Sequence, residues 1–548
     1  MTFKAFPLRA VLIGFVSLGV ACSDKPEPNQ PPPPPVEPWD GTYTPLVEPS
    51  DWVDPGPFAP CSFTPPAGTN IDCDDLSLFD RSKCDTASLA ALDSHGIYQV
   101  DMRQASGPTD VTNFAGFRVP ADGSTGLINF MYSLPTQLTR QQLNGSFHLS
   151  ARFTRRTRVQ QFVMAGCGVT SPGTVTGCFA LCTNGKFTSS GTFEAARMTW
   201  GRGESESSGG LRLLSETRVE TLRPVDVYVH RKHAYVVAVG DIFTRAEGGL
   251  TVVDVSDPSH PVIKKQITLP GDSFWNAAWA KDNALYIGSR TSGVIVYDIS
   301  NPAEPVFVRS LPAGAPVNVH TLFVDGNRLY AVSPSPAVPG ETLIFDISSP
   351  LEPVLLNRLV TPDEVSWIPS SHDSFAYQDR LYVNQFSTGY IVFDVKDAQN
   401  PRQLGRYTFS VDGREPLSHA SAVGTFAGKT IAFEGGEGMG THLRVLDVTD
   451  PANIQLIGQY KLRRQTSIHN IILKDKRLYI TYYHEGLRVL DVSVPPQPRE
   501  IAYFNTYRES DPGRTDEILD GAIGVRVPGD GHVYVVDMAR GLLILNEP

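Results

Sequence analysis

The second half of the chain repeats a short apolar run that ends in an acidic or amide residue. The clearest copies run from Val252 to Pro258, from Val296 to Pro302 and from Ile344 to Pro350. The seven terminal residues recur at intervals of 44 to 55 residues: Asp254, Asp298, Asp346, Asp394, Asp447, Asp491 and Asn546. A repeat of this period is typical of an array of small structural units that cannot bury a core singly. The pattern therefore predicts a repeat architecture.

Each unit contains four strand-like runs joined by turn signals. The second run carries a Tyr in most units, as in Asn283-Ala284-Leu285-Tyr286, and the third run ends in the recurring Asp. The Asp-x-Ser-x-Pro pattern that follows is good turn chemistry, so we expect the recurring Asp to be a turn residue and not a ligand. Four strands in a unit of this length are typical of a propeller blade. Seven such units predict an all-β fold with a seven-bladed β-propeller over residues 211–548.

The two ends of the repeat region suggest how the ring closes. The seventh run ends at Asn546, which leaves that unit without an outermost strand. Residues 211–221 resemble residues 261–268, which follow the first run and form the last strand of their unit. We therefore expect residues 211–221 to complete the seventh blade, because a closed ring hides the edges of its sheets.

The repeated runs resemble those of LVIVD-repeat propellers, a family named for a strand of this type. Leu250 to Asp254 and Leu487 to Asp491 show the resemblance best. It covers residues 211–548 and does not extend to the preceding region. It implies a propeller in an exported or cell-surface protein, but fold alone does not identify a ligand.

The N-terminus reads as an export signal. Residues 1–21 carry Lys4 and Arg9 ahead of an apolar stretch that is too short to span a bilayer. The sequence from Leu18 to Cys22 resembles a bacterial lipobox, in which the Cys is acylated, although Gly19 stands where that motif usually has Leu, Val or Ile. We expect lipid anchoring through Cys22 to the bacterial outer membrane. The alternative is ordinary secretory cleavage near Ala21, which would give a secreted or periplasmic protein.

Three further segments separate the signal from the propeller. Residues 22–58 read as a Pro-rich tether, residues 59–200 as a small disulfide-stapled and mostly β domain, and residues 201–210 as a flexible polar joint. The strand-like runs of the small domain cover residues 96–102, 126–134, 146–153, 158–165 and 192–200, and residues 74–92 have a loop-rich, partly helical pattern.

The cysteines support an oxidising compartment. Apart from Cys22, all six precede residue 183: Cys61, Cys73, Cys84, Cys167, Cys178 and Cys182. An even number in an exported protein predicts three disulfides, whose pairing the spacing leaves open. Zinc binding through Cys178 and Cys182 is the competing use.

One histidine pattern goes beyond scaffolding. Counting ten residues back from the Tyr of the second strand reaches a His in units three, four and six, and a His stands twelve before Ile431 in unit five; unit two has Asn276 at this place. The four histidines are His320, His372, His419 and His469. They begin the inner strands, which line the channel of a propeller, where neutral imidazoles can bind Zn²⁺, Cu²⁺ or Fe²⁺. The alternative is a structural role in spacing the blades. Asp373 is either an outer partner of His372 or a turn residue.

No other motif indicates chemistry. The Gly-rich stretch of residues 434–440 lacks the Lys and the strand–turn–helix context of a phosphate-binding loop, so it predicts a connection within a blade. No pattern marks a catalytic residue or an organic cofactor.

Charge and architecture together favour binding over catalysis. The net charge of −11 argues against nucleic acid and against electrostatic docking to anionic lipid. We expect a membrane-anchored exported protein whose propeller is a binding scaffold for a protein, a glycan or another component of the cell envelope. One alternative is an exported metalloprotein or metalloenzyme with a His-lined channel site. Another is an adhesive module that binds through residues 59–200.

Overall fold

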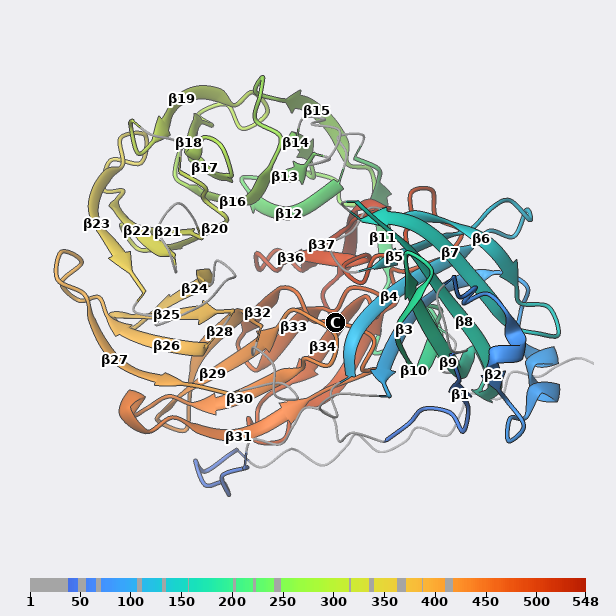
Figure 1. Cartoon of the computed structure of the whole chain (residues 1–548). Helices are drawn as coiled ribbons and strands as arrows, with labels where there is room; N and C mark the ends of the chain where they lie inside the picture. Colours follow the sequence, from blue (N-terminus) through green and yellow to red (C-terminus); the bar gives the residue numbers. More distant parts are fainter. Residues whose placement is uncertain are drawn as a thin grey trace, which may run out of the picture. The chain divides into compact units, whose positions relative to one another are not determined.

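The propeller region consists of seven four-stranded antiparallel sheets that follow one another around a ring (Figure 1). The computed structural model of the chain describes residues 38–47, 56–65, 70–105, 111–130, 135–155, 157–200, 204–219, 223–240, 248–314, 317–334, 340–361, 371–386, 388–409 and 417–548. Each sheet is one blade, and in the first six blades the strands run from the centre of the ring outward in chain order. The expected all-β fold with a seven-bladed propeller is confirmed.

The first six blades each take four consecutive strands. Blade 1 is β12 (Arg223–His230), β13 (His233–Val239), β14 (Gly249–Asp254) and β15 (Val262–Ile267); blade 2 is β16 (Trp275–Lys281), β17 (Ala284–Ser289), β18 (Gly293–Asp298) and β19 (Val306–Leu311); blade 3 is β20 (Thr321–Asp325), β21 (Arg328–Ser333), β22 (Glu341–Asp346) and β23 (Val354–Val360). Blade 4 is β24 (Ser371–Tyr377), β25 (Arg380–Gln385), β26 (Gly389–Asp394) and β27 (Arg402–Tyr407); blade 5 is β28 (Ser418–Phe426), β29 (Lys429–Gly436), β30 (Leu443–Asp447) and β31 (Gln455–Tyr460), with η3 (Pro451–Asn453) before β31; blade 6 is β32 (Ile471–Lys474), β33 (Arg477–Thr481), β34 (Leu487–Asp491) and β35 (Arg499–Phe504).

Blade 7 draws its strands from both ends of the repeat region. Its inner three are β36 (Ala522–Arg526), β37 (His532–Asp537) and β38 (Gly541–Asn546), and its outermost is β11 (Leu213–Thr217). β11 pairs antiparallel with β38, with Ser215 opposite Ile544. The expected closing strand is therefore confirmed, and it covers an edge that would otherwise stay unpaired.

The recurring Asp acts as the expected turn residue. In blade 2, Asp298 Oδ1 accepts hydrogen bonds from the backbone N–H of Ser300 at 2.7 Å and from its hydroxyl at 2.6 Å. The hydroxyl and the N–H hold the pKa of Asp298 below its usual value because both bonds favour the carboxylate. The Pro turns also join neighbouring blades, since the hydroxyl of Tyr286 donates to the carbonyl of Pro350 at 2.7 Å.

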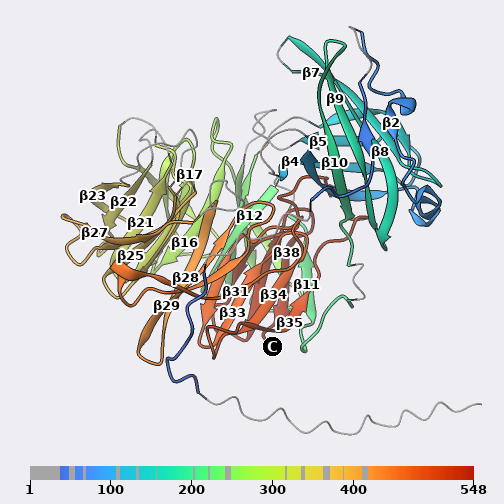
Figure 2. The same ribbon diagram turned by 60° about the horizontal axis from the view of Figure 1, so that its bottom comes forward.

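The region before the propeller is a closed antiparallel barrel. Its strands, in chain order, are β3 (Gly96–Gln104), β4 (Val111–Val119), β5 (Leu127–Phe130), β6 (Thr136–Gln142), β7 (His148–Arg155), β8 (Arg158–Ser171), β9 (Thr174–Thr183) and β10 (Lys186–Arg197). Each pairs with the next, and β10 pairs with β3 to close the barrel, whose strands are blue to green in Figure 2. Aromatic side chains fill the interior: the Tyr98 and Phe117 rings stack at 4.7 Å, and Phe147 and Phe193 lie 5.5 Å apart. A barrel of this size is a packed core and not a pore.

Three disulfides fasten the segment ahead of the barrel to its wall, as expected. They join Cys61 to Cys178, Cys73 to Cys182 and Cys84 to Cys167. This pairing also uses both cysteines of the alternative zinc site. The fastened segment contains β1 (Ser62–Phe63), η1 (Leu76–Leu78), β2 (Phe79–Asp80) and η2 (Thr86–Ala91). Each disulfide ends on β8 or β9, so the loop-rich segment is fixed to one side of the barrel.

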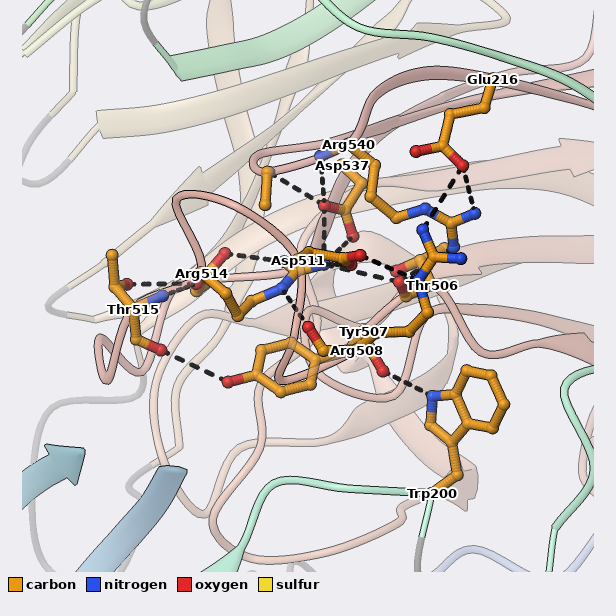
Figure 3. Close-up of polar contacts among 12 residues, drawn as sticks. Trp200, Glu216, Thr506, Tyr507, Arg508, Asp511, Arg514, Thr515, Asp537 and Arg540 are labelled. Carbon is orange, nitrogen blue, oxygen red and sulfur yellow. Dashed lines mark hydrogen bonds and ion pairs between the residues drawn. The ribbon is translucent and has the colours of Figure 1, made fainter. Parts of the chain in front are cut away.

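The segment between β35 and β36 carries a buried charge cluster (Figure 3). Arg514 pairs with Asp520 at 2.9 Å, with Asp537 at 3.0 Å and with Asp511 at 3.2 Å. The same segment contacts the barrel, because Glu509 pairs with Arg197 at 2.8 Å. Further barrel contacts use its backbone, where the Asp516 carbonyl accepts from Gln99 and the Tyr507 carbonyl from Trp200. The Arg514 cluster therefore shapes a loop that binds both parts of the protein.

A short N-terminal segment packs on blade 5. The hydroxyl of Tyr43 donates to Asp447 Oδ2 at 2.7 Å, and the N–H of Leu46 donates to the carbonyl of Leu456 at 2.8 Å. Trp39 and Tyr43 contact the apolar core between blades 5 and 6. Residues 39–548 form one compact unit. Among the described residues, no helix has the length and apolar character that crossing a bilayer requires.

Candidate metal centre

A bulge interrupts the start of the inner strand in most blades. The ladder between the first two strands skips a residue in blades 1, 2, 4, 5 and 7. The skipped residues are Val225, Asn276, His372, His419 and Ile523. Bulges redirect side chains and are common beside functional sites. In blades 3 and 6 the corresponding residues, His320 and His469, directly precede the inner strands β20 and β32.

The four predicted histidines meet as one group, which we call the His layer: His320, His372, His419 and His469. Neighbouring rings have centroids 4.3 Å apart for His320 and His372, 4.1 Å for His372 and His419, and 4.4 Å for His419 and His469. Four consecutive blades therefore place their imidazoles in one continuous row. Asn276 extends the row in blade 2, where its side-chain nitrogen lies 3.3 Å from His320 Nε2.

Hydrogen bonds fix which nitrogen of two of these rings carries the hydrogen. His469 Nδ1 lies 2.8 Å from the carbonyl oxygen of Ile523. A carbonyl oxygen only accepts, so Nδ1 of His469 donates and Nε2 keeps its lone pair. His372 Nδ1 lies 3.1 Å from Asp373 Oδ1, and this carboxylate gives His372 the same tautomer. Both Nε2 atoms are thus prepared as metal ligands by an outer partner, and Asp373 takes the first of its two expected roles.

The Nε2 atoms of His320 and His372 lie 2.9 Å apart. His372 Nε2 has a lone pair to offer, so a hydrogen bond here requires His320 to donate from Nε2. The Asn276 amide donates to the carbonyl of His320 at 3.2 Å. The same amide also lies 3.3 Å from His320 Nε2, where a bond from the amide would require Nε2 to accept and not to donate. Two nitrogens at this separation, each about 2.1 Å from one ion, subtend an angle of about 90°, as neighbouring metal ligands do.

Glu437 supplies a carboxylate that the sequence pattern did not reveal. Its Oε1 lies 3.7 Å from His469 Nε2, and its Oε2 lies 3.7 Å from His419 Nε2. The residue belongs to the Gly-rich stretch 434–440, whose first three residues end β29 and whose remainder begins the connection to β30 within blade 5. Gly438 allows the loop to approach Leu417, because a Cβ atom there would lie 2.5 Å from Leu417 Cδ1. A single acid between glycines was the available signal, and on its own it is a weak one.

Tyr483 holds the Glu437 carboxylate in place. Its hydroxyl donates to Glu437 Oε1 at 2.5 Å, and its ring centroid lies 5.2 Å from that of His469. The backbone of Tyr483 has a φ of 37°, a left-handed conformation that costs a non-glycine residue free energy. Its N–H and carbonyl pair with Ala522, which keeps the strained residue in position. Strain of this kind is often found where a side chain must be aimed at a site.

Burial keeps the imidazoles of the His layer neutral. It lowers the pKa of all four, and for His469 burial and the neighbouring His419 lower the pKa to about 4. Neutral imidazole is the ligating form, so the site is ready for a metal ion at neutral pH. The side chains of His372, His469 and Glu437 are each 14% exposed, which leaves the group open to solvent on one side.

Two overlapping sets of three residues can hold an ion. Within each set the ligand atoms lie within 4.8 Å of one another: His372, Asp373 and His419 form one set, and His419, Glu437 and His469 form the other. The second set has two imidazoles and one carboxylate, a combination that binds Fe²⁺ and Zn²⁺ in other proteins. Since Asp373 is engaged by His372, the second set is the better candidate.

Comparison with known proteins places the repeats in a family. The LVIVD repeat model matches residues 225–268, 277–311 and 467–506, which lie in blades 1, 2 and 6, so the chain contains LVIVD repeats. No curated protein matches the chain.

Several solved structures are similar to the chain. One is the WD40 β-propeller domain of Doa1, with 10% identity over 62% of this chain and 97% of that chain and a TM-score of 0.43. A protein from Lactobacillus plantarum has 14% identity over 56% of this chain and 89% of its own, with a TM-score of 0.42. The computationally designed Ika8 protein has 10% identity over 69% of this chain and 95% of its own, with a TM-score of 0.38. None of these similarities bears on function.

Proposed function

Taking the chain as a seven-bladed propeller with LVIVD repeats, we propose that it is an exported protein that binds a transition-metal ion in its channel. The ligands are His419, His469 and Glu437, with His372 and His320 beside them. One observation carries the proposal. The lone pair of His469 Nε2, fixed by the Ile523 carbonyl, faces the Glu437 carboxylate at 3.7 Å. Two acceptors that face each other across such a gap repel unless a cation lies between them.

The donor set indicates the class of metal. Imidazole nitrogen and carboxylate oxygen suit Zn²⁺, Fe²⁺ and Cu²⁺ better than Mg²⁺ or Ca²⁺, which prefer oxygen ligands. The solvent-exposed side of the group leaves room for one further ligand on the ion. The site can therefore bind a small molecule through the metal.

Location in the cell envelope is a second part of the proposal. We infer export because three disulfides persist only in an oxidising compartment. The lipobox-like sequence ending at Cys22 favours a lipid anchor in the outer membrane. Acylation can be read from the mass of the mature N-terminal peptide. After cell fractionation, we expect a Cys22→Ser variant to be absent from the membrane fraction.

One feature favours an additional role as an interaction scaffold. The first residue of the outermost strand is an exposed Val in three consecutive blades, at 54% for Val262, 62% for Val306 and 60% for Val354. Blade 4 has Arg402 at this place, paired with Asp394 at 2.8 Å. A row of exposed aliphatic side chains suits a protein partner better than a glycan. Charging the row, as in Val306→Glu, should abolish co-purification of such a partner from envelope extracts.

The test of the metal site is a measurement of metal content. The protein should be exported without Cys22 so that the disulfides form, then analysed beside His419→Ala, His469→Ala and a control, His260→Ala. His260 is a suitable control because its side chain is 83% exposed and lies on a turn of blade 1. We expect about one equivalent of a transition metal in the parent and the control, and a loss of affinity of at least about tenfold in the other two. A parent that binds neither Zn²⁺ nor Co²⁺ at micromolar concentration contradicts the proposal.

A further inference from the structure

A second layer of channel residues lies three positions beyond the first on each inner strand. In blades 1 to 4 these residues are all aromatic, and we call them the aromatic crescent: Tyr228, Trp279, Phe323 and Phe375. Their rings contact one another in sequence. The centroid of Trp279 lies 5.1 Å from that of Tyr228 and 4.9 Å from that of Phe323, and Phe323 lies 4.5 Å from Phe375. Four blades thus build one continuous aromatic surface next to the His layer.

The aromatic crescent keeps part of its surface exposed, and each of its rings also packs against the apolar core of a blade. All four side chains are half-buried, so solvent reaches each of them. Their neighbours on the same strands point the other way and are buried between blades: Val227, Ala278, Leu322 and Ala376. Each half-exposed ring keeps apolar surface in contact with water, which costs free energy. A ligand that covers these rings would remove that cost.

Arg526 of blade 7 limits the charge of a ligand that can bind to the aromatic crescent. Its guanidinium carbon lies 5.0 Å from the ring centroid of Trp279 and 5.4 Å from that of Tyr228. The protein's own cation therefore already occupies the cation–π position over these two rings. Asp226 pairs with Arg526 at 3.6 Å and offsets its charge. The remaining surface, over Phe323 and Phe375, suits a flat and uncharged group.

The spacing of the two layers sets the length of the ligand. Three residues of β-strand, at about 3.3 Å each, separate the layers by about 10 Å. His372 and Phe375 belong to the same strand, β24, so the two layers are held on one rigid element. A molecule that reaches from the metal ion to the aromatic crescent needs a body of about two aryl rings in length.

We propose that the channel binds an aryl compound whose oxygen-donor head ligates the metal ion and whose flat apolar body stacks on the aromatic crescent. This inference rests on the proposed function, because the head group requires the metal. It adds to that function the chemical class of the ligand.

The experiment compares three hydroxamates that share a metal-binding head and differ in their body. These are acetohydroxamate, benzohydroxamate and 4-phenylbenzohydroxamate, titrated into the Co²⁺-loaded protein and followed by the visible absorption of the metal. We expect the affinity to rise at least about tenfold from the first probe to the third, because stacking and burial of two rings add to the binding of the head.

Variants locate the gain on the aromatic crescent. In Phe323→Ala and Phe375→Ala, the three probes should differ in affinity by no more than about twofold, while the metal content stays that of the parent. Phe375→Leu keeps apolar volume without the ring and covers the case in which the Ala variant does not fold. The matched control is Phe307→Ala, which removes a ring that is 48% exposed on the outer strand β19 and should keep the full gain.

The outcomes separate this inference from the proposed function. If no metal binds, the proposed function fails and the ligand inference fails with it. If metal and acetohydroxamate bind but the two aryl probes bind no tighter, only the ligand inference is overturned. A gain that survives in Phe323→Ala and Phe375→Ala equally overturns it, since the aryl body would then bind elsewhere.

Discussion

At the scale of single residues, the proposed metal site depends on groups that would fix protons on the ligands without themselves binding the ion. The Ile523 carbonyl and the Asp373 carboxylate choose the tautomers of His469 and His372, and the Tyr483 hydroxyl binds the Glu437 carboxylate. Such outer partners commonly change metal affinity by one or two orders of magnitude. Burial keeps the imidazoles uncharged, and this lowers the free energy of unfolding at low pH.

That cost predicts a pH dependence of the metal-free protein. The pKa of His469 is about 4 in the folded state because of burial, below its usual value of 6.5, so the unfolded chain binds an extra proton between these two values. The free energy of unfolding should therefore fall as the pH falls from 6.5 to 4, by about 3 kcal/mol for His469 alone. Urea unfolding at several pH values measures the effect. His469→Asn should weaken the dependence of the free energy of unfolding on pH, and His260→Ala should not. An equal dependence in the parent and both variants would disprove that His469 causes it.

At the scale of elements, two connections between strands contact other parts of the protein. The Gly-rich loop brings Glu437 to the His layer, and the backbone N–H of Gly440 in that loop donates to the carbonyl of Arg464 at 2.8 Å. Arg464 in turn pairs with Asp101 of the barrel at 2.7 Å. The segment between β35 and β36 makes further contacts with the barrel. Its Arg514 cluster is drawn in Figure 3. Loops between rigid blades can vary in this way without disturbing the cores.

The Arg514 cluster should be costly to break. Arg514 is 1% exposed and faces three carboxylates, so Arg514→Met leaves buried negative charges without their partner. We expect a loss of about 3–5 kcal/mol in the free energy of unfolding, measured by denaturant titration. Arg499→Met is the control, because Arg499 is 60% exposed and its bond to Asp491 lies at the surface. It should change stability by less than about 1 kcal/mol, and a similar loss in both variants would contradict the role of the cluster.

The repeat explains which elements the sequence could predict. Each blade reuses one strand–turn–strand register, so counting back from the Tyr of the second strand located His320, His372 and His469, and counting back from Ile431 located His419. Glu437 reaches the same point from the connection between β29 and β30, and no sequence period marks it. Tyr483 contributes through a strained backbone angle that propensity does not reveal. The closure of the barrel by β10 and β3 joins residues about ninety positions apart, and this pairing leaves no local pattern.

At the scale of the whole molecule, two kinds of stabilisation divide the chain. The barrel relies on three disulfides that close long loops, with 83 to 117 residues between the paired cysteines. The propeller has no cysteine after Cys182 and relies on ring closure and apolar packing between blades. Segments 39–47 and 505–521 add contacts at the edges of the ring.

Reduction should therefore act on one part of the protein. Each disulfide that closes a loop of this length contributes about 4 kcal/mol, so a reductant should lower the melting temperature of the barrel by many degrees. We expect the propeller transition in scanning calorimetry to shift little and metal binding to remain. Loss of both transitions together would show that the propeller depends on the barrel for its own stability.

The pairing of β11 with β38 also sets an order of events in folding. Ser215 and Ile544 are partners across more than three hundred residues, so their contact carries a high entropic cost and forms late. The barrel, whose strands all lie within residues 96–197, can form before the blades are complete. The propeller must wait for its last strand before its seventh sheet is complete. Until β11 pairs with β38, the outer edge of β38 stays open, which makes the interval before closure the period in which this chain is most vulnerable to aggregation and proteolysis.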